Sequence, residues 1–228
     1  LLEAFIAGVE AEYALGCAFT HELFWKGWWT TGLLGAFGAT VAAARALGLD
    51  QQQIRNAICF TASQASGTYT VVGTPMKPFA NGRAAQLGIE AALYARAGLT
   101  SHPDAFEHAK GFITLFSDGI FKRDLLTRLG THFILVSPGL AYKLYPVCSG
   151  VQPAAEALIS LILEENLDAR TITHVHCEVT GDIMNYLEHE NPVTVTEAQF
   201  SMNFAMACVL VHGELSIAQM SETVLQDP

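Results

Sequence analysis

The sequence predicts an all-α helical domain followed by a smaller α+β domain. Before about Thr131, long stretches place apolar or small residues three and four positions apart, which is the spacing of one helix face. After that point, β-branched runs at 132–136 and 171–180 alternate with helical stretches. Helices followed by a mixture of strands and helices favour two domains, which we expect at residues 1–131 and 132–228.

In the first domain, residues 2–19 show the periodicity of an amphipathic helix. The stretch 32–47 consists mostly of glycine and alanine, whose small side chains allow a neighbouring helix to approach closely. We therefore expect a central helix there, ended by Gly48. Asp50 is a predicted N-cap, with Gln53 at the capping-box position. The further expected helices are 50–63, 82–97, 103–109 and 122–129.

In the second domain, we expect the two β-branched runs to form strands. Helices are predicted at 153–165 and at 196–212, the latter ended by Gly213. Ser216 begins one more predicted helix.

Composition limits the function classes. Hydrophobic residues make up 51% of the 228 residues and charged residues only 15%. A chain of this size has a limited interior, so we expect part of the apolar surplus to be buried against a second subunit. The net charge of −10 argues against nucleic-acid binding, which needs a basic face.

No apolar stretch reaches the roughly 18 residues of a membrane span. The five cysteines lack CxxC spacing, which favours reduced thiols and no zinc site. We expect a cytoplasmic protein, or a mitochondrial one if the source is eukaryotic and a transit segment precedes the chain. GxSxG, P-loop and strand-linked GxGxxG motifs are absent from the sequence, so no acyl-transfer or nucleotide motif is predicted.

The segment GTPMKPFANGRAA, residues 73–85, is the first candidate for chemistry. It places Lys77 in a loop framed by glycine and proline, just ahead of a helix expected to begin near Gly82. A cation beside the free N–H groups of a helix N-terminus can bind a carboxylate. The alternative is a solvated loop lysine without a ligand.

The segment AYKLYPVCSG, residues 141–150, is the second candidate. Lys143 lies there between two tyrosines and could offer another cation to an anionic ligand. The alternative is a lysine whose stem covers apolar surface while its ammonium reaches water. His174 and His176 share one face of a predicted strand, but no third ligand is evident, so no metal site is predicted.

Six blocks in order resemble the MmgE/PrpD family, whose members include 2-methylcitrate dehydratases, cis-aconitate decarboxylases and iminodisuccinate epimerases. The blocks are KGWWTTGLLGAFGATVAAARALGLD, ICFTASQASG, GTPMKPFANGRAAQLG, GFITLFSDG, KLYPVCSG and NPVTVTEAQFSMNFAMACVLVHG. Any single block is unspecific, whereas the ordered set spans nearly the whole chain.

The resemblance implies a helical domain followed by a smaller α+β lid, with the active site in the cleft between them. It also implies a homodimer, and a chain that lacks part of each domain. Family members act on small di- or tricarboxylates without a metal or organic cofactor. They break a C–H bond alpha to a carboxylate, then lose water, lose CO₂ or return the proton to the other face.

Carried over by position, Lys77 matches the lysine of the family's G-T-x-x-K loop and Lys143 the lysine of its K-x-Y-P motif. The resemblance implies that both are catalytic residues that hold substrate carboxylates, and that one of them also transfers protons. Thr31 matches a threonine of the family's G-W/F-H-x-T turn. No metal ligand and no cofactor is implied.

Three positions depart from the family pattern. Histidine is usual where this chain has Trp29, histidine is frequent where it has Ala80, and tyrosine is frequent where it has Phe204. The implied substrate-binding set is therefore Trp29, Thr31, Lys77, Lys143 and Phe204.

The sequence thus favours an MmgE/PrpD-like hydro-lyase or racemase/epimerase that removes a proton alpha to a carboxylate of a small polycarboxylate. The missing histidine at Trp29 shifts the expectation modestly towards epimerase-like or uncharacterised members. The alternative is a catalytically diverged helical module that keeps the fold for packing or dimerisation.

Overall fold

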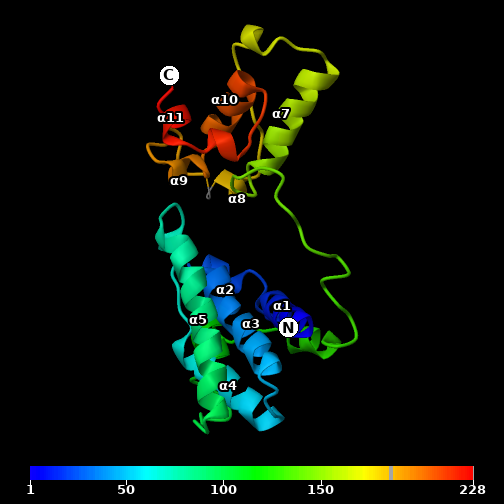
Figure 1. The fold of residues 1–228 in the computed structure, drawn as a ribbon, viewed down its shortest axis with the longest axis vertical. Helices are drawn as coiled ribbons and strands as arrows, with labels where there is room; N and C mark the ends of the chain where they lie inside the picture. Colours follow the sequence, from blue (N-terminus) through cyan, green and yellow to red (C-terminus); the bar gives the residue numbers. More distant parts are fainter. Residues whose placement is uncertain (185–186, 228) are drawn as a thin grey trace. The chain divides into compact units, whose positions relative to one another are not determined.

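The computed structural model describes residues 1–184 and 187–227, and the chain divides into two compact units, 1–140 and 141–228. In the described part of both units, the regular secondary structure is helical (Figure 1). No helix in the described part of the chain combines the length and apolar character that crossing a membrane requires.

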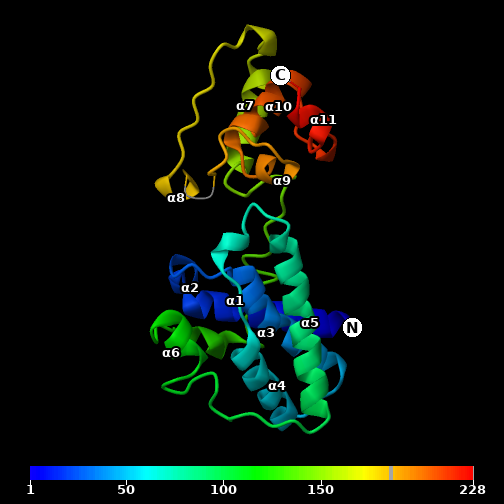
Figure 2. The ribbon, with the colours of Figure 1, turned by 90° about the vertical axis from the view of Figure 1, so that its left-hand side faces the viewer.

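The first unit consists of helices α1 to α6 with two short 3₁₀ helices. Figure 2 shows α3 lying among α1, α4 and α5, and these are the helices that α3 contacts most. The predicted central helix is therefore confirmed. The bounds are α1 Leu2–Phe19, α2 Glu22–Trp25, α3 Thr30–Ala46, α4 Gln51–Gln64, η1 Tyr69–Val71, α5 Met76–Arg96, α6 Phe112–Ser117 and η2 Arg123–Arg128.

Small residues let α3 approach its neighbours, as the glycine-rich pattern predicted. A Cβ added to Gly8 of α1 would stand 2.6 Å from the carbonyl oxygen of Gly38 in α3. A Cβ added to Gly88 of α5 would stand 2.5 Å from the backbone nitrogen of Thr40. Both distances are too short for a real side chain, so these contacts require glycine.

The start of α4 is confirmed in detail. The Asp50 carboxylate accepts a hydrogen bond from the Gln53 backbone N–H at 2.8 Å, and the Gln53 side chain accepts one from the Asp50 N–H at 3.1 Å. This reciprocal pair is the predicted capping box.

The predicted start of α5 was wrong, because the helix begins at Met76 and not near Gly82. Pro78 lies in its first turn, where the missing N–H would have no partner within the helix in any case. The Thr74 hydroxyl accepts a hydrogen bond from the Met76 N–H at 3.2 Å and so supports this early start. Lys77 is consequently a helix residue.

The predicted helix at 103–109 was also wrong, because this segment forms a series of turns. The Nδ1 atoms of His102 and His108 accept hydrogen bonds from the backbone N–H groups of Asp104 and Lys110. Such local side-chain bonds compete with helix formation. The predicted helix at 122–129 is present only as η2, and the sequence did not predict α2 or α6.

The core of the first unit is aromatic. Phe112 stacks on Phe116 with ring centroids 4.2 Å apart, and Phe19 meets Phe112 edge-on at 5.8 Å. Phe37 of α3 completes this buried group. The helices of the first unit are therefore fixed around rigid rings that bury large apolar areas.

The second unit has its own core, in which α7 and α10 pack together around Val151, Ala205 and Val209. Helices were predicted near the positions of both. The bounds are α7 Gln152–Glu164, η3 Ala169–Thr171, α8 Gly181–Met184, α9 Val195–Ala198, α10 Met202–His212, η4 Ile217–Gln219 and α11 Glu222–Leu225.

The single helix predicted at 196–212 is broken into α9 and α10. Thr194 and Ser201 each accept a hydrogen bond from the backbone N–H three residues later, at 3.2 Å in both cases. Two N-caps seven residues apart begin two helices in succession. Gly213 ends α10 with φ of 72°, as predicted.

The structure shows neither predicted strand. The described residues hold only one isolated bridge, between Trp28 and Thr68. At 132–136 the chain turns, and the backbone N–H groups of Ile134 and Leu135 bind the Glu10 carboxylate. Most of 171–180 is irregular backbone without a ladder partner. β-branched residues favour extended backbone, but a strand also needs a neighbour. The α+β character expected of the second domain is therefore not observed.

Candidate functional site

The adjacent tryptophans of the KGWWTTG stretch face different surroundings. Trp28 packs against Phe116 with ring centroids 4.5 Å apart, so it belongs to the aromatic core. Trp29 is the N-cap residue of α3, and its backbone N–H donates to the Gly67 carbonyl at 3.0 Å. The turn is thus held by the segment that precedes η1, and it directs the second indole towards α5.

Lys77, the first candidate, meets Trp29 directly. Its ammonium lies 4.9 Å from the centroid of the Trp29 ring, which is within the range of a cation–π interaction. The indole Nε1–H donates a hydrogen bond to Asn81 Oδ1 at 3.0 Å. Lys77 and Asn81 are one helical turn apart on α5, so the same face of this helix presents both to the indole.

The start of α5 corrects one part of the expected chemistry. The Met76 N–H donates to the Thr74 hydroxyl, the Lys77 N–H donates to the Thr74 carbonyl, and Pro78 has no N–H. The first turn therefore does not present a set of free N–H groups beside Lys77. The side-chain ammonium of Lys77, together with the positive end of the α5 dipole, is what this turn offers an anion.

A groove of about 640 Å³ adjoins this cluster on α5. Gly32 and Ala80 line it, and Gly32 lies close to both the Trp29 indole and Ala80: a Cβ on Gly32 would stand 3.1 Å from Trp29 Cδ1 and 3.9 Å from Ala80 Cβ. The polar residues that line it include Arg83, Glu90 and Thr68. The groove therefore offers one cation, one carboxylate and a hydroxyl group beside the Lys77 cluster.

Thr31 lies in a different pocket. Its side chain is exposed and lines a hollow of about 750 Å³ together with Glu12, His21 and Lys122. Burial raises the pKa of the Glu12 carboxyl. Neither Trp29 nor Lys77 lines this hollow, so the structure does not bring Thr31 together with them.

Lys143 and Phe204 belong to the second unit. Lys143 is exposed, and its ammonium donates to the Val147 carbonyl of its own loop at 3.0 Å. Gln152 organises the same loop, because its Oε1 accepts from the backbone N–H groups of Leu144 and Tyr145, both at 3.0 Å. Phe204 is half-buried against the core of this unit.

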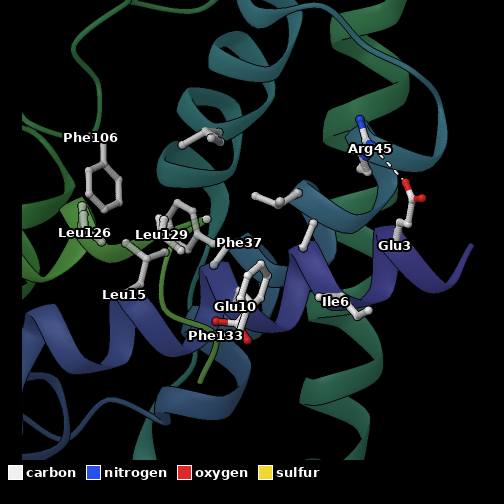
Figure 3. A pocket seen from close by; sticks show the side chains of 15 residues that line it. Glu3, Ile6, Glu10, Leu15, Phe37, Arg45, Phe106, Leu126, Leu129 and Phe133 are labelled. Carbon is white, nitrogen blue, oxygen red and sulfur yellow. Dashed lines mark hydrogen bonds and ion pairs between the residues drawn. The ribbon is translucent and has the colours of Figure 1, made fainter. Parts of the chain in front are cut away.

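One further pocket of the first unit is almost entirely apolar (Figure 3). It has a volume of about 780 Å³, and Figure 3 shows Leu15, Phe37 and Phe133 among the side chains around it. The Glu3–Arg45 ion pair at 3.0 Å lies at one side. A polycarboxylate inside would lose hydration, and the Arg45 guanidinium on the lining is already paired with Glu3, so the cost would be several kcal/mol or more for each unpaired charge. This pocket does not suit such a ligand.

Among the described residues, no group of three or more histidine, cysteine or acidic side chains is arranged to hold a metal ion. His174 and His176 stack with ring centroids 6.4 Å apart, and His176 lies 3.6 Å from a Glu178 carboxylate oxygen.

Sequence reasoning missed Asn81, Arg83 and Gln152. The signal for Asn81 was its spacing of four residues from Lys77, which has meaning only if both residues are helical. Because α5 was expected to start near Gly82, both residues were placed in a loop, where a spacing of four does not predict a shared face.

Comparison with known proteins supports a family assignment. Residues 1–123 match the MmgE/PrpD N-terminal domain and residues 145–228 match the MmgE/PrpD C-terminal domain. Cis-aconitate decarboxylase of Homo sapiens is 25% identical over 236 residues, which cover 100% of this chain and 48% of that protein. Cis-aconitate decarboxylase of Aspergillus terreus is 25% identical over 236 residues, covering 96% of this chain and 48% of the relative.

The cis-aconitate decarboxylase-like protein oryM of Aspergillus oryzae is 25% identical over 241 residues, covering 98% of this chain and 50% of the relative. The chain thus spans about half the length of the curated relatives it matches. Both parts of the chain match domains of one family, in the order that the resemblance of the six blocks suggested. The chain belongs to the MmgE/PrpD family.

Proposed function

We propose that this chain is part of an enzyme that binds a small di- or tricarboxylate and removes a proton alpha to one of its carboxylates. The observation that carries the proposal is the Lys77 ammonium held over the Trp29 ring at the start of α5. A positive charge in the first turn of a helix opposes the helix dipole, and a bound anion would offset that conflict. The neighbouring groove adds Arg83 for a second carboxylate.

In this proposal Lys77 binds a substrate carboxylate and stabilises the negative charge that develops when the adjacent C–H bond breaks. The indole face attracts the positive charge of the ammonium, and this charge suits the stabilisation of a developing anion. Lys143 is the second proposed carboxylate ligand, and Thr31 and Phe204 remain proposed substrate-binding residues from the family pattern.

The reaction that follows proton removal is a lyase step or an epimerisation. The relatives found are named for decarboxylation of cis-aconitate, which favours a tricarboxylate and a lyase. Trp29 carries an indole, which has one N–H donor and no basic nitrogen, so it cannot supply the proton transfer of a histidine. We therefore place the proton transfer on another group.

The test is binding and exchange. Isothermal titration calorimetry should show binding of citrate or cis-aconitate to the wild-type protein. Lys77→Ala should weaken it about 10- to 100-fold, the equivalent of one charge-assisted hydrogen bond. Lys110→Ala, the same charge change at an exposed position of the same unit, should leave it unchanged. Exchange of the alpha C–H in deuterated water, followed by NMR, should likewise depend on Lys77.

A non-catalytic packing or dimerisation module is the second candidate, favoured by the apolar side chains that α5 exposes. Met76, Phe79, Ile89 and Tyr94 are each between 47% and 58% exposed. We propose a homodimer for either function, and light scattering after gel filtration measures it. Dimerisation without binding of either acid and without exchange would support the module and overturn the enzyme.

A further inference from the structure

We propose that Trp29 and Asn81 are positioning residues, which together hold the Lys77 ammonium at a fixed place at the start of α5. This inference deepens the proposed function and rests on it for the ligand. Its structural part, a lysine held on an indole that an asparagine fixes, can be tested without any ligand.

The first step of the argument is helical spacing. Lys77, Ala80 and Asn81 occupy positions i, i+3 and i+4 of α5 and therefore share one face. The Lys77 ammonium lies over the Trp29 ring, and Asn81 accepts the hydrogen bond of the indole. Ala80 lies near Gly32, which the indole also approaches. The side chain of the α3 N-cap residue thus contacts two residues one turn apart on α5.

The second step is the orientation of the ring. An indole has one N–H, and here it donates to Asn81 Oδ1 at 3.0 Å. Its backbone is fixed separately, by the bond from its N–H to the Gly67 carbonyl. With both the backbone and the ring edge fixed, the ring face has one direction, and a cation–π partner must lie over that face.

The third step concerns the two family histidines that this chain lacks. The replaced positions, Trp29 and Ala80, both lie next to Gly32. A Cβ added to Gly32 would stand 3.1 Å from Trp29 Cδ1 and 3.9 Å from Ala80 Cβ. A large ring at position 29 needs room, and alanine at position 80 leaves more room than an imidazole would. The two replaced positions therefore lie beside the same glycine of α3.

The first experiment measures the position of Lys77 by NMR. A lysine side chain over an indole experiences a ring current, so the Lys77 ε-methylene protons should resonate upfield of those of Lys110. Trp29→Leu should abolish this shift, and Trp29→Phe should retain part of it. Asn81→Leu, which has a similar shape but no acceptor, should reduce it, whereas Asn81→Asp should restore it because an acceptor oxygen is present again.

The Phe background guards against misfolding as an explanation. Phenylalanine at position 29 has no N–H to donate, so adding Asn81→Leu to Trp29→Phe should produce no further change in the Lys77 shift. An upfield shift that is absent in the wild type, or that persists in Trp29→Leu, would overturn the lysine–indole contact. A shift that Asn81→Leu leaves intact in the wild-type background would overturn the role of Asn81.

The second experiment measures citrate affinity in the same variants. Asn81→Leu should weaken citrate binding about five-fold, the equivalent of one neutral hydrogen bond. In the NMR measurement, Asn81→Asp should keep the upfield shift of Lys77 that Asn81→Leu reduces. If the wild-type protein shows the ring-current shift but binds no citrate or cis-aconitate, the proposed function fails while the positioning of Lys77 stands. If it binds citrate and Asn81→Leu has no effect on affinity or shift, the positioning fails while the function stands.

Discussion

Gly88 of α5 lies so close to Ala39 of α3 that a Cβ on Gly88 would stand 2.5 Å from the Ala39 Cβ. Backbone atoms of α3 are equally near, so the added carbon could not be accommodated by turning a side chain. We expect Gly88→Ala to lower the free energy of unfolding by about 2 kcal/mol or more, because overpacking forces the two helices apart. Urea denaturation measures the loss.

Gly82 provides the matched control for that variant, since it lies on the same helix with nothing within 4 Å of its missing Cβ. Gly82→Ala should raise stability by roughly 0.5–1 kcal/mol, the difference in helix propensity between the two residues. Equal effects of the two substitutions would contradict the close packing of α3 against α5.

Glu10 and Glu12, two residues apart on α1, should respond in opposite ways to replacement by glutamine. The buried Glu10 carboxylate accepts hydrogen bonds from the N–H groups of Ile134 and Leu135, both at 2.9 Å. A glutamine amide has one acceptor oxygen instead of two, so Glu10→Gln should destabilise the protein by roughly 1–3 kcal/mol at pH 7.

Glu12→Gln should be neutral or stabilising at pH 7. Burial raises the pKa of the Glu12 carboxyl, so its folded-state pKa lies above the unfolded value. The stability that this group contributes is therefore fully present below the unfolded pKa and is lost as the pH rises through the folded pKa. Urea denaturation at pH 4 and pH 7 measures this. The free energy of unfolding should fall less between pH 4 and pH 7 in Glu12→Gln than in the wild type. A larger drop would show that the carboxylate has a favourable partner.

The helices of the first unit could be predicted wherever a local signal decides the structure. The capping box of Asp50 and Gln53 is encoded within four residues. The glycine and alanine pattern of α3 indicates that other helices can approach it closely. The start of α5 was predicted wrongly because the glycine and proline around Lys77 were interpreted as a loop, although proline is accepted in the first turn of a helix.

The strands expected at 132–136 and 171–180 show the limit of local signals. A pattern of β-branched residues reports a preference for extended backbone, but whether a second strand lies alongside is not a property of the segment. At 132–136 the backbone donors are satisfied by a carboxylate 124 and 125 residues earlier in the sequence. No local pattern could indicate that partner.

The candidate site was predictable in part. Lys77 and Trp29 could be identified from the sequence as candidate site residues. Their contact depends on the packing of α5 against α3, which the sequence did not predict. Asn81 becomes a candidate only because it accepts a hydrogen bond from the same indole. The family pattern grouped Thr31 with them. Thr31 lies two residues after the N-cap Trp29, and at this position of α3 its side chain lines another pocket.

Cys17 and Cys208 should differ strongly in thiol reactivity. Cys17 is exposed, whereas Cys208 is buried in α10, and burial raises the pKa of its thiol to about 11. Only the thiolate reacts, so Ellman's reagent at pH 8 should modify Cys17 rapidly and leave Cys208 unmodified until the protein unfolds. Mass spectrometry of peptides from a timed reaction identifies the order. Early modification of Cys208 in the folded protein would contradict its burial.

Tyr145 provides a prediction about pH in the second unit. Its hydroxyl donates a hydrogen bond to the Glu156 carboxylate, and this bond, followed by burial and by the negative charge of Glu156, raises the pKa of the phenol to about 12. An ordinary tyrosine has a pKa of about 10. Because the folded state holds the proton more tightly than the unfolded state, the stabilising contribution is fully present below about pH 10 and is lost as the pH rises towards 12.

The measurement is an NMR titration of ¹³C-labelled tyrosine rings, with Tyr145 assigned by Tyr145→Phe. The Tyr145 resonance should titrate near pH 12 in the wild type and closer to pH 10 in Glu156→Gln, where the charged acceptor is absent. The neutral amide can still accept a hydrogen bond, so any shift that remains in this variant measures burial and neutral hydrogen bonding without the charge. An unchanged titration in Glu156→Gln would show that Glu156 does not hold the phenol.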